Sequence, residues 1–215
     1  MNASKQLTKA TASVVRMAAI AVAVVALAAG CASSPSPGPV LLSLPPAATG
    51  AAPATGAADA AAPKLLAIRR VSIPEYLVAR RVRFRADAST LAEWPNTYWA
   101  ERIEIGVSRE FVSVLRAQLP GWAVCDTTCD DQAPTLTLQV DLAPMDYLRS
   151  TQTLQARARV TVSSAGVSPR VLQTREWNYA VKAGADTAQA QAQAISELLT
   201  RVATAAAPLV SAAKP

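Results

Sequence analysis

The chain has 215 residues, a formal net charge of +6 and no histidine. The missing histidine removes the commonest general base, the commonest metal ligand and the side chain that titrates near neutral pH, which argues against an enzyme or a metal protein. Three of the positive charges lie in residues 1–30, so the remainder carries only +3 and gives little support to nucleic-acid binding.

Residues 1–30 have the pattern of an export signal peptide. Lys5, Lys9 and Arg16 come first, and residues 17–29 then carry no charge, as in the basic and apolar regions of such a peptide. The apolar run is shorter than the about 20 residues that cross a bilayer core. We therefore expect residues 1–30 to be removed on export.

Cys31 directly follows Ala28, Ala29 and Gly30, an arrangement that resembles the lipobox of bacterial lipoproteins. The usual lipobox leucine lies three positions before the cysteine, whereas here Leu27 lies one position earlier. The resemblance implies that Cys31 carries a diacylglycerol and an N-acyl chain and becomes the first residue of the mature protein. No other cofactor is expected.

An acylated Cys31 would determine the location of the mature chain. Each buried methylene contributes about 0.8 kcal/mol, so two or more acyl chains anchor a protein firmly to a membrane. In lipoproteins of this kind an aspartate after the cysteine retains the protein in the inner membrane, whereas this chain has Ala32. The resemblance therefore implies an outer-membrane protein that faces the periplasm. An ordinary secretory signal peptide is the alternative interpretation.

Residues 31–63 are predicted to form a tether behind the anchor. They are rich in Ala, Pro, Ser and Gly and carry one charge, Asp59, a composition that cannot bury enough apolar surface to order itself. Residues 40–44, Val-Leu-Leu-Ser-Leu, are the apolar exception. They fit either a first edge strand or an apolar stretch of the tether, and both interpretations stay open.

From residue 64 the composition is that of a folded domain, which we expect to extend to residue 210, with residues 211–215 as a tail. Alternation of apolar and polar side chains predicts strands. The predicted strands cover residues 65–73, 81–85, 89–93, 136–142, 154–162 and 171–181. The second and third of these are expected to pair as a hairpin.

Two amphipathic helices are predicted from apolar residues that recur every three or four positions. The first covers residues 97–118, with Trp99 on its apolar stripe, and ends at a Pro-Gly pair. The second begins after Asp186, which forms a capping-box pattern with Gln189, and ends at Pro208. Together these elements predict an α+β domain, a mostly antiparallel sheet with both helices packed on one face.

The two cysteines of this domain, Cys125 and Cys129, are predicted to form a disulfide. An oxidising periplasm favours the bond, which would restrict the unfolded chain by only about 2 kcal/mol because the ring is short. Two free thiols are the alternative interpretation. The nearby Asp126, Asp130 and Asp131 are interpreted as solvated loop residues rather than a calcium site, so no metal is expected.

Four short segments lie close together in the first half of the domain. They are Val71-Ser-Ile-Pro-Glu-Tyr-Leu77, Arg80-Arg81, Arg83-Phe-Arg-Ala-Asp87 and Tyr98-Trp-Ala-Glu101. With the lipobox in front, they resemble the ABC-type transport auxiliary lipoproteins, the family typified by paraquat-inducible protein C. This chain departs from the family at Arg102-Ile103, where Pro-Leu is usual. The likeness covers residues 65–209 in element order and is sequence-specific over residues 71–103.

The resemblance implies a non-enzymatic lipoprotein subunit of a trans-envelope lipid transport system. Its partners would be an inner-membrane ABC transporter and an MCE-domain protein that bridges the periplasm. The chain itself would be the docking or receiving component, with a homo-oligomer as one form, and it would bind no nucleic acid. A structural or assembly lipoprotein of the envelope with no transport link is the alternative. The sequence contains neither Gly-x-Ser-x-Gly nor a phosphate-binding glycine loop, in agreement with a non-enzymatic role.

Arginines are the distinctive surface residues of the predicted sheet. Arg81, Arg83 and Arg85 must share one face of a strand, and Arg157 and Arg159 share one face of another. Guanidinium groups bind phosphate and carboxylate in a bidentate manner, so these five are the candidate contacts for lipid headgroups or an acidic partner. A solvated outer face that keeps the sheet soluble is the alternative interpretation.

Overall fold

The computed structural model describes residues 38–46, 64–126, 129 and 133–214. The predicted signal peptide, the predicted acylation site Cys31 and residues 47–63 of the predicted tether lie outside the described residues. The predicted folded domain and the apolar exception at residues 40–44 lie within them, except for a few loop positions.

The described part of the chain contains eight strands, two α-helices and two single-turn 3₁₀ helices. The strands are β1 (Val40–Leu42), β2 (Lys64–Ile68), β3 (Arg81–Arg85), β4 (Leu91–Trp99), β5 (Trp122–Asp126), β6 (Leu136–Leu148), β7 (Thr153–Ser164) and β8 (Val171–Lys182). The helices are α2 (Ile103–Gln118) and α3 (Ala188–Ala212), and the 3₁₀ turns are η2 (Glu75–Leu77) and η3 (Arg149–Thr151).

The strands form one mixed sheet in which the longest pairings are antiparallel. β6 pairs with β7, β7 with β8 and β3 with β4 in antiparallel register. Shorter parallel pairings join β1 to β4 and β2 to both β5 and β6. β7 lies along one side of β6, whereas β2 and β3 share its other side. The α+β prediction is confirmed, and the parallel pairings are the part that side-chain alternation does not reveal.

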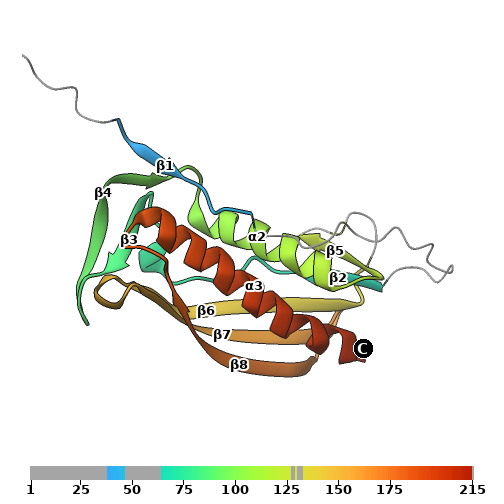
Figure 1. Ribbon diagram of the computed structural model, residues 1–215. Helices are drawn as coiled ribbons and strands as arrows, with labels where there is room; N and C mark the ends of the chain where they lie inside the picture. The colour runs from blue at the N-terminus through green and yellow to red at the C-terminus, as the bar shows by residue number, and fades with distance from the viewer. Residues whose placement is uncertain (1–37, 47–63, 127–128, 130–132, 215) are drawn as a thin grey trace, which may run out of the picture. The chain divides into compact units, whose positions relative to one another are not determined.

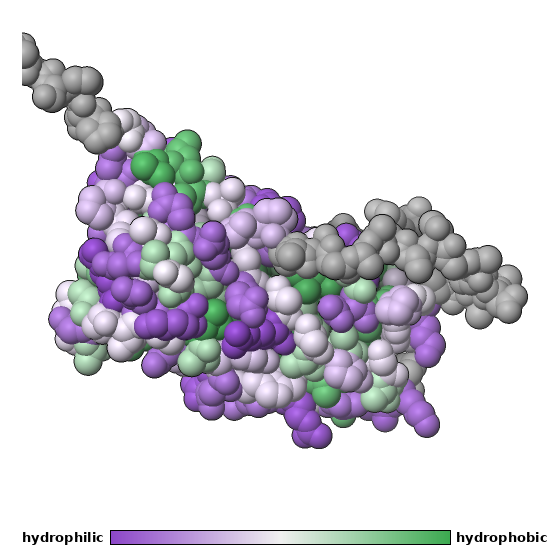
Figure 2. All heavy atoms as spheres, viewed as in Figure 1, coloured by the Kyte–Doolittle hydropathy of each residue, from purple (hydrophilic) through white to green (hydrophobic). Residues whose placement is uncertain are grey.

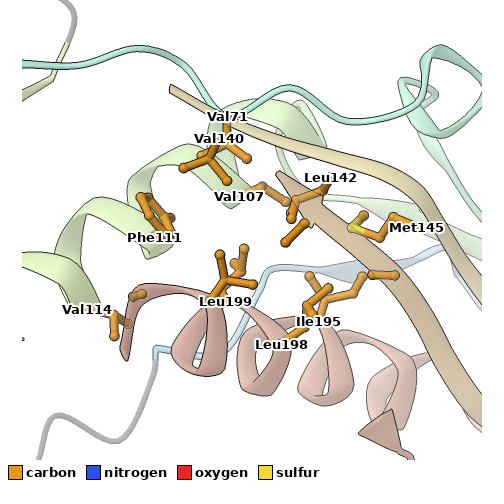
Figure 3. Close-up of a cluster of buried hydrophobic side chains, with 14 of the residues drawn as sticks. Val71, Val107, Phe111, Val114, Val140, Leu142, Met145, Ile195, Leu198 and Leu199 are labelled. Atoms are coloured by element: carbon orange, nitrogen blue, oxygen red, sulfur yellow. The ribbon is translucent and has the colours of Figure 1, made fainter. Parts of the chain in front are cut away.

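The two helices lie side by side over one face of the sheet (Figure 1). The side chains predicted to face inward from β6 and β7 are all buried there. They are Leu136, Leu138, Val140 and Leu142 of β6, and Leu154, Ala156, Ala158, Val160 and Val162 of β7. Figure 3 shows part of this core, in which Leu142 and Met145 of β6 lie near Ile195 and Leu198 of α3. Burial of such side chains contributes about 25 cal/mol per Å² of apolar surface and is the main source of stability.

Strand β6 continues well beyond its predicted end at residue 142. Its register against β7 shifts between Leu142 and Met145, at the position of Pro144. Proline lacks the amide that a central strand donates, so in a sequence it indicates the end of a strand. Here Pro144 lies in a β-bulge, after which Met145 and Tyr147 continue the buried face.

Strand β2 is shorter than predicted and ends at Ile68. Beyond it the amide of Arg69 donates to the carbonyl oxygen of Leu138 at 2.9 Å, and Ser72 forms an isolated parallel bridge with Asp141. The chain therefore follows β6 as far as Ser72 without regular pairing and then turns into η2.

The first helix begins at Ile103, not at residue 97, and Trp99 is the last residue of β4 rather than part of the helix. Backbone hydrogen bonds explain the correction, because the Trp99 amide donates to the carbonyl oxygen of Arg80 at 2.7 Å. Trp99 is still a core residue, 5% exposed. Its spacing from Ile103 mimics a helical stripe, and periodicity alone cannot distinguish the two cases.

The second helix differs from the prediction at both ends. Its N-cap is Thr187, whose Oγ1 accepts a hydrogen bond from the Ala190 amide at 3.1 Å, and not Asp186. Its C-terminal end lies beyond Pro208, because Val210 is fully buried and packing holds the last turn. Neither described helix combines the length and apolar character needed to cross a membrane.

Of residues 40–44, Val40–Leu42 form an edge strand of the sheet, in agreement with the edge-strand interpretation for these three residues. β1 is the outermost strand beside β4, and Leu42 and Leu44 are 8% and 5% exposed. The Ala100 amide donates to the carbonyl oxygen of Leu42 at 2.7 Å, and Ser196 Oγ of α3 donates to that of Pro45 at 2.8 Å. This part of the predicted tether is therefore packed against the sheet and α3.

Candidate functional site

The five predicted arginines project from the face of the sheet opposite the helices. On β3 they alternate with Val82 and Phe84, which are buried in the core. On β7 they alternate with Ala156, Ala158 and Val160, which are buried in the same core. The prediction that each set shares one strand face is confirmed, and both sets lie on what we call the outer face of the sheet.

Arg81 and Arg83 are held by one carboxylate on the neighbouring strand. Their Nε atoms lie 3.4 and 3.3 Å from the two carboxylate oxygens of Glu93 on β4. Arg83 also donates from Nη1 to the carbonyl oxygen of Tyr76 at 2.8 Å, so it ties η2 to β3. These two guanidinium groups are thus engaged within the fold.

Arg85 takes part in a three-residue cluster with Asp146 of β6 and Tyr76 of η2. Asp146 Oδ1 accepts hydrogen bonds from Arg85 Nη2 at 2.9 Å and from the Tyr76 hydroxyl at 3.0 Å. The guanidinium of Arg85 also lies 5.5 Å from the centre of the Tyr76 ring. Burial and the hydrogen bond to Asp146 raise the pKa of Tyr76, and that same carboxylate raises the pKa of Arg85. The cluster joins η2 and β3 to Asp146 of β6, which lies 61 residues beyond Arg85.

Arg157 and Arg159 lie beside two shallow hollows on the outer face. Arg159 Nε pairs with Glu176 of β8 at 2.5 Å, whereas Arg157 Nε donates to the carbonyl oxygen of Ala143 at 3.2 Å. One hollow, of about 590 Å³, is bordered by Arg157 and Asn178, and the other, of about 230 Å³, by Arg157 and Arg159. Arg157 is therefore the arginine shared by both hollows.

Around the five predicted arginines the outer face is close to electrically balanced, not strongly cationic. Among the described residues, four carboxylates lie between the five arginines: Glu93, Asp141, Asp146 and Glu176. Arg157 differs from the other four arginines because its partner is a carbonyl group and not a carboxylate. Of the five predicted arginines, Arg157 is thus the one whose recorded hydrogen bond is to a backbone carbonyl alone.

The four segments that carry the family resemblance meet at one end of the sheet. Two of them, 80–81 and 98–101, contribute to a hollow of about 320 Å³ whose walls are residues 78–80 and 99–104. Two exposed arginines, Arg80 and Arg102, line it together with the buried carboxylate of Glu104, which is ion-paired with Arg102. Residues 78–80 and 99–104 therefore form one structural unit around this hollow.

Glu101 fixes the connection between β4 and α2 in this unit. Its two carboxylate oxygens accept hydrogen bonds from the two terminal nitrogens of Arg109 on α2, both at 2.6 Å. The hydrogen bonds from Arg109 lower the pKa of Glu101. A bidentate pair of this kind orients both side chains, so Glu101 acts as a brace at the start of the helix.

Sequence reasoning missed a second arginine cluster, centred on Arg149. The guanidinium of Arg149 lies 4.4 Å from the centre of the Trp94 ring and 5.0 Å from that of Phe84. Its Nε donates to Asp186 at 2.9 Å, which is why Asp186 does not cap α3. Trp94 in turn donates from Nε1 to Gln191 at 2.7 Å. These partners come from four separate elements, so no local pattern could have indicated them.

The space between the sheet and the helices is filled by side chains. The enclosed cavity between them measures about 10 Å³ and is bordered by Leu77, Tyr147 and Gln191, among others. Tyr147 is 2% exposed and its hydroxyl has no hydrogen-bond partner in the described part of the chain. Burial raises the pKa of this hydroxyl. This cavity is far smaller than the pockets of about 300–1,000 Å³ that hold drug-sized molecules.

The two cysteines of the domain lie together at the end of β5. The Cα atoms of Cys125 and Cys129 are 5.3 Å apart and their sulfur atoms are within bonding distance, so the arrangement is compatible with the predicted disulfide. Asp130 and Asp131 lie outside the described residues. Where the chain is described, no group of acidic or cysteine side chains could hold a metal ion.

Comparison with known proteins adds a family match. Residues 43–207 match the family described as the ABC-type transport auxiliary lipoprotein component, whereas no curated protein matches the chain. The crystal structure of an uncharacterized protein superposes with a TM-score of 0.62 at 16% identity, covering 81% of this chain and 99% of that one. A Xanthomonas campestris protein of the family DUF330 superposes with a TM-score of 0.54 at 17% identity, covering 69% and 81%. At such identities these structures show a shared fold alone.

Proposed function

The chain belongs to the family of ABC-type transport auxiliary lipoproteins, and from that premise we propose that it is the docking or receiving component of a trans-envelope lipid transport system. In this role it is anchored through an acylated Cys31 in the outer membrane and faces the periplasm. It meets an MCE-domain protein that works with an inner-membrane ABC transporter. It carries out no chemistry of its own.

The observation that carries the proposal is the extent of the family match. It reaches from residue 43 to residue 207, so it includes strands β2–β8, all of α2 and most of α3. Most of the described domain, rather than one motif, is therefore shared with lipoproteins that assist ABC-type transporters. The function at this coarse level is support of envelope transport.

The filled interior supports docking rather than lipid carriage. A protein that carries a lipid needs an enclosed apolar chamber, and the described interior offers a cavity of only about 10 Å³. The larger hollows are shallow and lie on the surface, at the outer face and at the corner where the family segments meet. We infer that lipid passes over or beside this domain and not through it.

Arg157 is the side chain on the outer face best suited to touch a lipid phosphate or an acidic partner. Its Nε is engaged by the Ala143 carbonyl, whereas its terminal nitrogens carry donors in a fork that matches phosphate and carboxylate. Arg159 lies beside it and is ion-paired with Glu176. Arg159 can therefore bind an incoming anion only if that anion displaces the Glu176 carboxylate. The proposed contact is therefore led by Arg157.

Deletion and complementation test the proposed function. Cells that lack the chain should become sensitive to an anionic detergent, because disturbed lipid traffic weakens the outer membrane. The wild-type gene should restore resistance, whereas Cys31→Ser should not, although the exported domain is still made. Unchanged resistance in the deletion strain, or full rescue by Cys31→Ser, would contradict an anchored role in lipid transport.

A further inference from the structure

The exposed edge of the sheet at β1 combines apolar, aromatic and cationic side chains. Val40 and Leu41 are 42% and 57% exposed. Figure 2 shows a strongly apolar patch at the position of β1, bordered by polar surface. Large exposed aliphatic side chains on a short edge strand are unusual enough to suggest a surface that is covered in the cell.

The strand register places three kinds of side chain in one row. Leu41 of β1 is paired with Tyr98 of β4, and Tyr98 is paired with Arg81 of β3. The guanidinium groups of Arg81 and Arg80 lie 5.1 and 6.0 Å from the centre of the Tyr98 ring. We call this set, with Val40, the β1 corner.

Charge at the β1 corner is positive on balance. Arg81 shares Glu93 with Arg83, at 3.4 Å from its own Nε. Arg80 is exposed and forms no ion pair within the described part of the chain. The corner thus combines exposed aliphatic side chains, an amphipathic tyrosine and arginines. Membrane-interface segments have this composition, because arginine binds lipid phosphate and tyrosine lies at the level of the headgroups.

The β1 corner is held rigidly by the fold. The residues that flank Leu41 in the sheet are fixed, since Leu42 and Leu44 are buried and the Leu42 carbonyl accepts the Ala100 amide at 2.7 Å. Leu41 therefore stays exposed because its strand presents it outward, and not because the segment has frayed.

The length of chain before β1 brings this corner close to the anchor. Nine residue steps separate Cys31 from Val40, and at about 3.3–3.6 Å per residue they span at most about 32 Å. A tether over residues 31–63 would allow a much longer reach. Because β1 is already part of the fold, the attachment point of the domain is the β1 corner itself.

We propose that the β1 corner rests on the phospholipid surface of the membrane that holds the Cys31 anchor. Val40 and Leu41 enter the headgroup region, and Arg80 binds phosphate beside Arg81, which is paired with Glu93. The contact fixes the orientation of the domain and leaves the part of the outer face around Arg157 free for a partner. This proposal rests on the acylation of Cys31 that is part of the proposed function.

A depth measurement on the acylated full-length mature chain tests this contact. An environment-sensitive dye is attached at Leu41→Cys, and the protein is reconstituted in phosphatidylethanolamine–phosphatidylglycerol vesicles that contain a headgroup-nitroxide lipid. The matched control carries the dye at Val167→Cys, a fully exposed position in the turn after β7. Strand β7 is about 36 Å long, so this turn lies about that far from the end of the sheet at which β7 begins. Unlabelled background is measured on the protein without an introduced cysteine.

The dye at position 41 should lose roughly half its emission, because interfacial side chains lie about 5–10 Å into the headgroup–acyl boundary. The dye at position 167 should keep its emission. Equal emission at both sites would overturn the proposal. A dye at position 41 that is shielded from aqueous iodide but not quenched by the nitroxide lipid would also overturn the proposal. That result would mean that a second copy of the chain or another protein covers the β1 corner.

The mass of the mature N-terminus, measured on the same preparation, distinguishes failure of the membrane contact from failure of the proposed function. If Cys31 carries no acyl chains, the proposed anchor and the membrane contact both fail. If Cys31 is acylated and position 41 is not quenched, the membrane contact alone fails and the proposed function stands.

Discussion

The two faces of the sheet are stabilised in different ways. The inner face is apolar, and its side chains are buried by contact with α2 and α3. Each buried side chain therefore stabilises the fold through contacts with many neighbours. The outer face is polar, and each arginine has one or two specific partners, such as Asp146 for Arg85 and Glu176 for Arg159. The difference teaches where to look for function: the inner face specifies the fold, and the outer face displays side chains that a partner can engage.

Removal of a large inner side chain should have the largest effect on stability. Phe111→Ala takes away a side chain with no exposed surface, and such substitutions cost about 3–5 kcal/mol. Urea unfolding followed by circular dichroism measures the loss. Val171→Ala, at a 66% exposed position, is the control and should change the free energy of unfolding by less than about 0.5 kcal/mol. Similar losses in both variants would contradict the assignment of the core.

Disruption of the Arg85–Asp146–Tyr76 cluster should have an intermediate effect. Asp146→Ala leaves a partly buried guanidinium and a hydroxyl without their shared acceptor, which costs about 1–3 kcal/mol. Asp141→Ala is the matched control, because Asp141 lies on the same strand and, within the described residues, its carboxylate accepts hydrogen bonds from Gln139 alone. The same urea titration compares them, and a control loss as large as that of Asp146→Ala would contradict the role of the cluster.

The effect of pH on the Glu101–Arg109 pair should be smaller. Hydrogen bonds from Arg109 lower the pKa of Glu101 below its ordinary value of 4.5. The ionised Glu101 therefore stabilises the folded state, and this stabilisation is fully present above pH 4.5. This contribution is lost as pH falls through the lowered pKa. Because the pair is partly exposed, we expect less than about 1 kcal/mol.

Glu101→Gln should therefore lower stability at neutral pH and flatten the acid limb of the stability curve between pH 5 and 2. Thermal unfolding midpoints across this range measure the change. An acid limb as steep in the variant as in the wild type would show that Glu101 does not contribute to it.

Substitution of Arg157 should have the smallest effect on stability. Arg157→Ala removes one exposed hydrogen bond to a carbonyl, so the free energy of unfolding should change by less than about 0.5 kcal/mol. Detergent resistance should nevertheless fall, because Arg157 is proposed to contact lipid headgroups or an acidic partner. Arg175→Ala, an exposed arginine on β8, is the matched control and should keep resistance. Full resistance in both variants would contradict the proposed contact at Arg157 and favour a solvated outer face without a binding role.

Local side-chain patterns predicted the inner face well. Alternation in β6 and β7 and the apolar stripes of both helices identified the buried residues, because burial of one face imposes a period on the sequence. Element ends were predicted less well. Trp99 and Ile103 are spaced like helix neighbours although one ends a strand, and Pro208 looked like a stop although packing of Val210 carries α3 past it.

The candidate site could be predicted only in part. The strand faces of Arg81, Arg83 and Arg85 followed from alternation, but their partners did not, because Asp146 lies 61 residues beyond Arg85. Ion pairing across the sheet depends on strand order and register, which a single sequence does not contain. The balance of charge on the outer face and the special position of Arg157 therefore emerged only from the structure.

The most direct test of the central claim is recovery of the intact assembly. The full-length chain, tagged at its C-terminus, is purified from solubilised envelopes, and the proteins recovered with it are identified by mass spectrometry, with Cys31→Ser as the control. We expect an MCE-domain protein and the subunits of an ABC transporter, and a clear loss of both with Cys31→Ser. Recovery of the chain with neither partner, from envelopes in which both are present, would contradict a transport role.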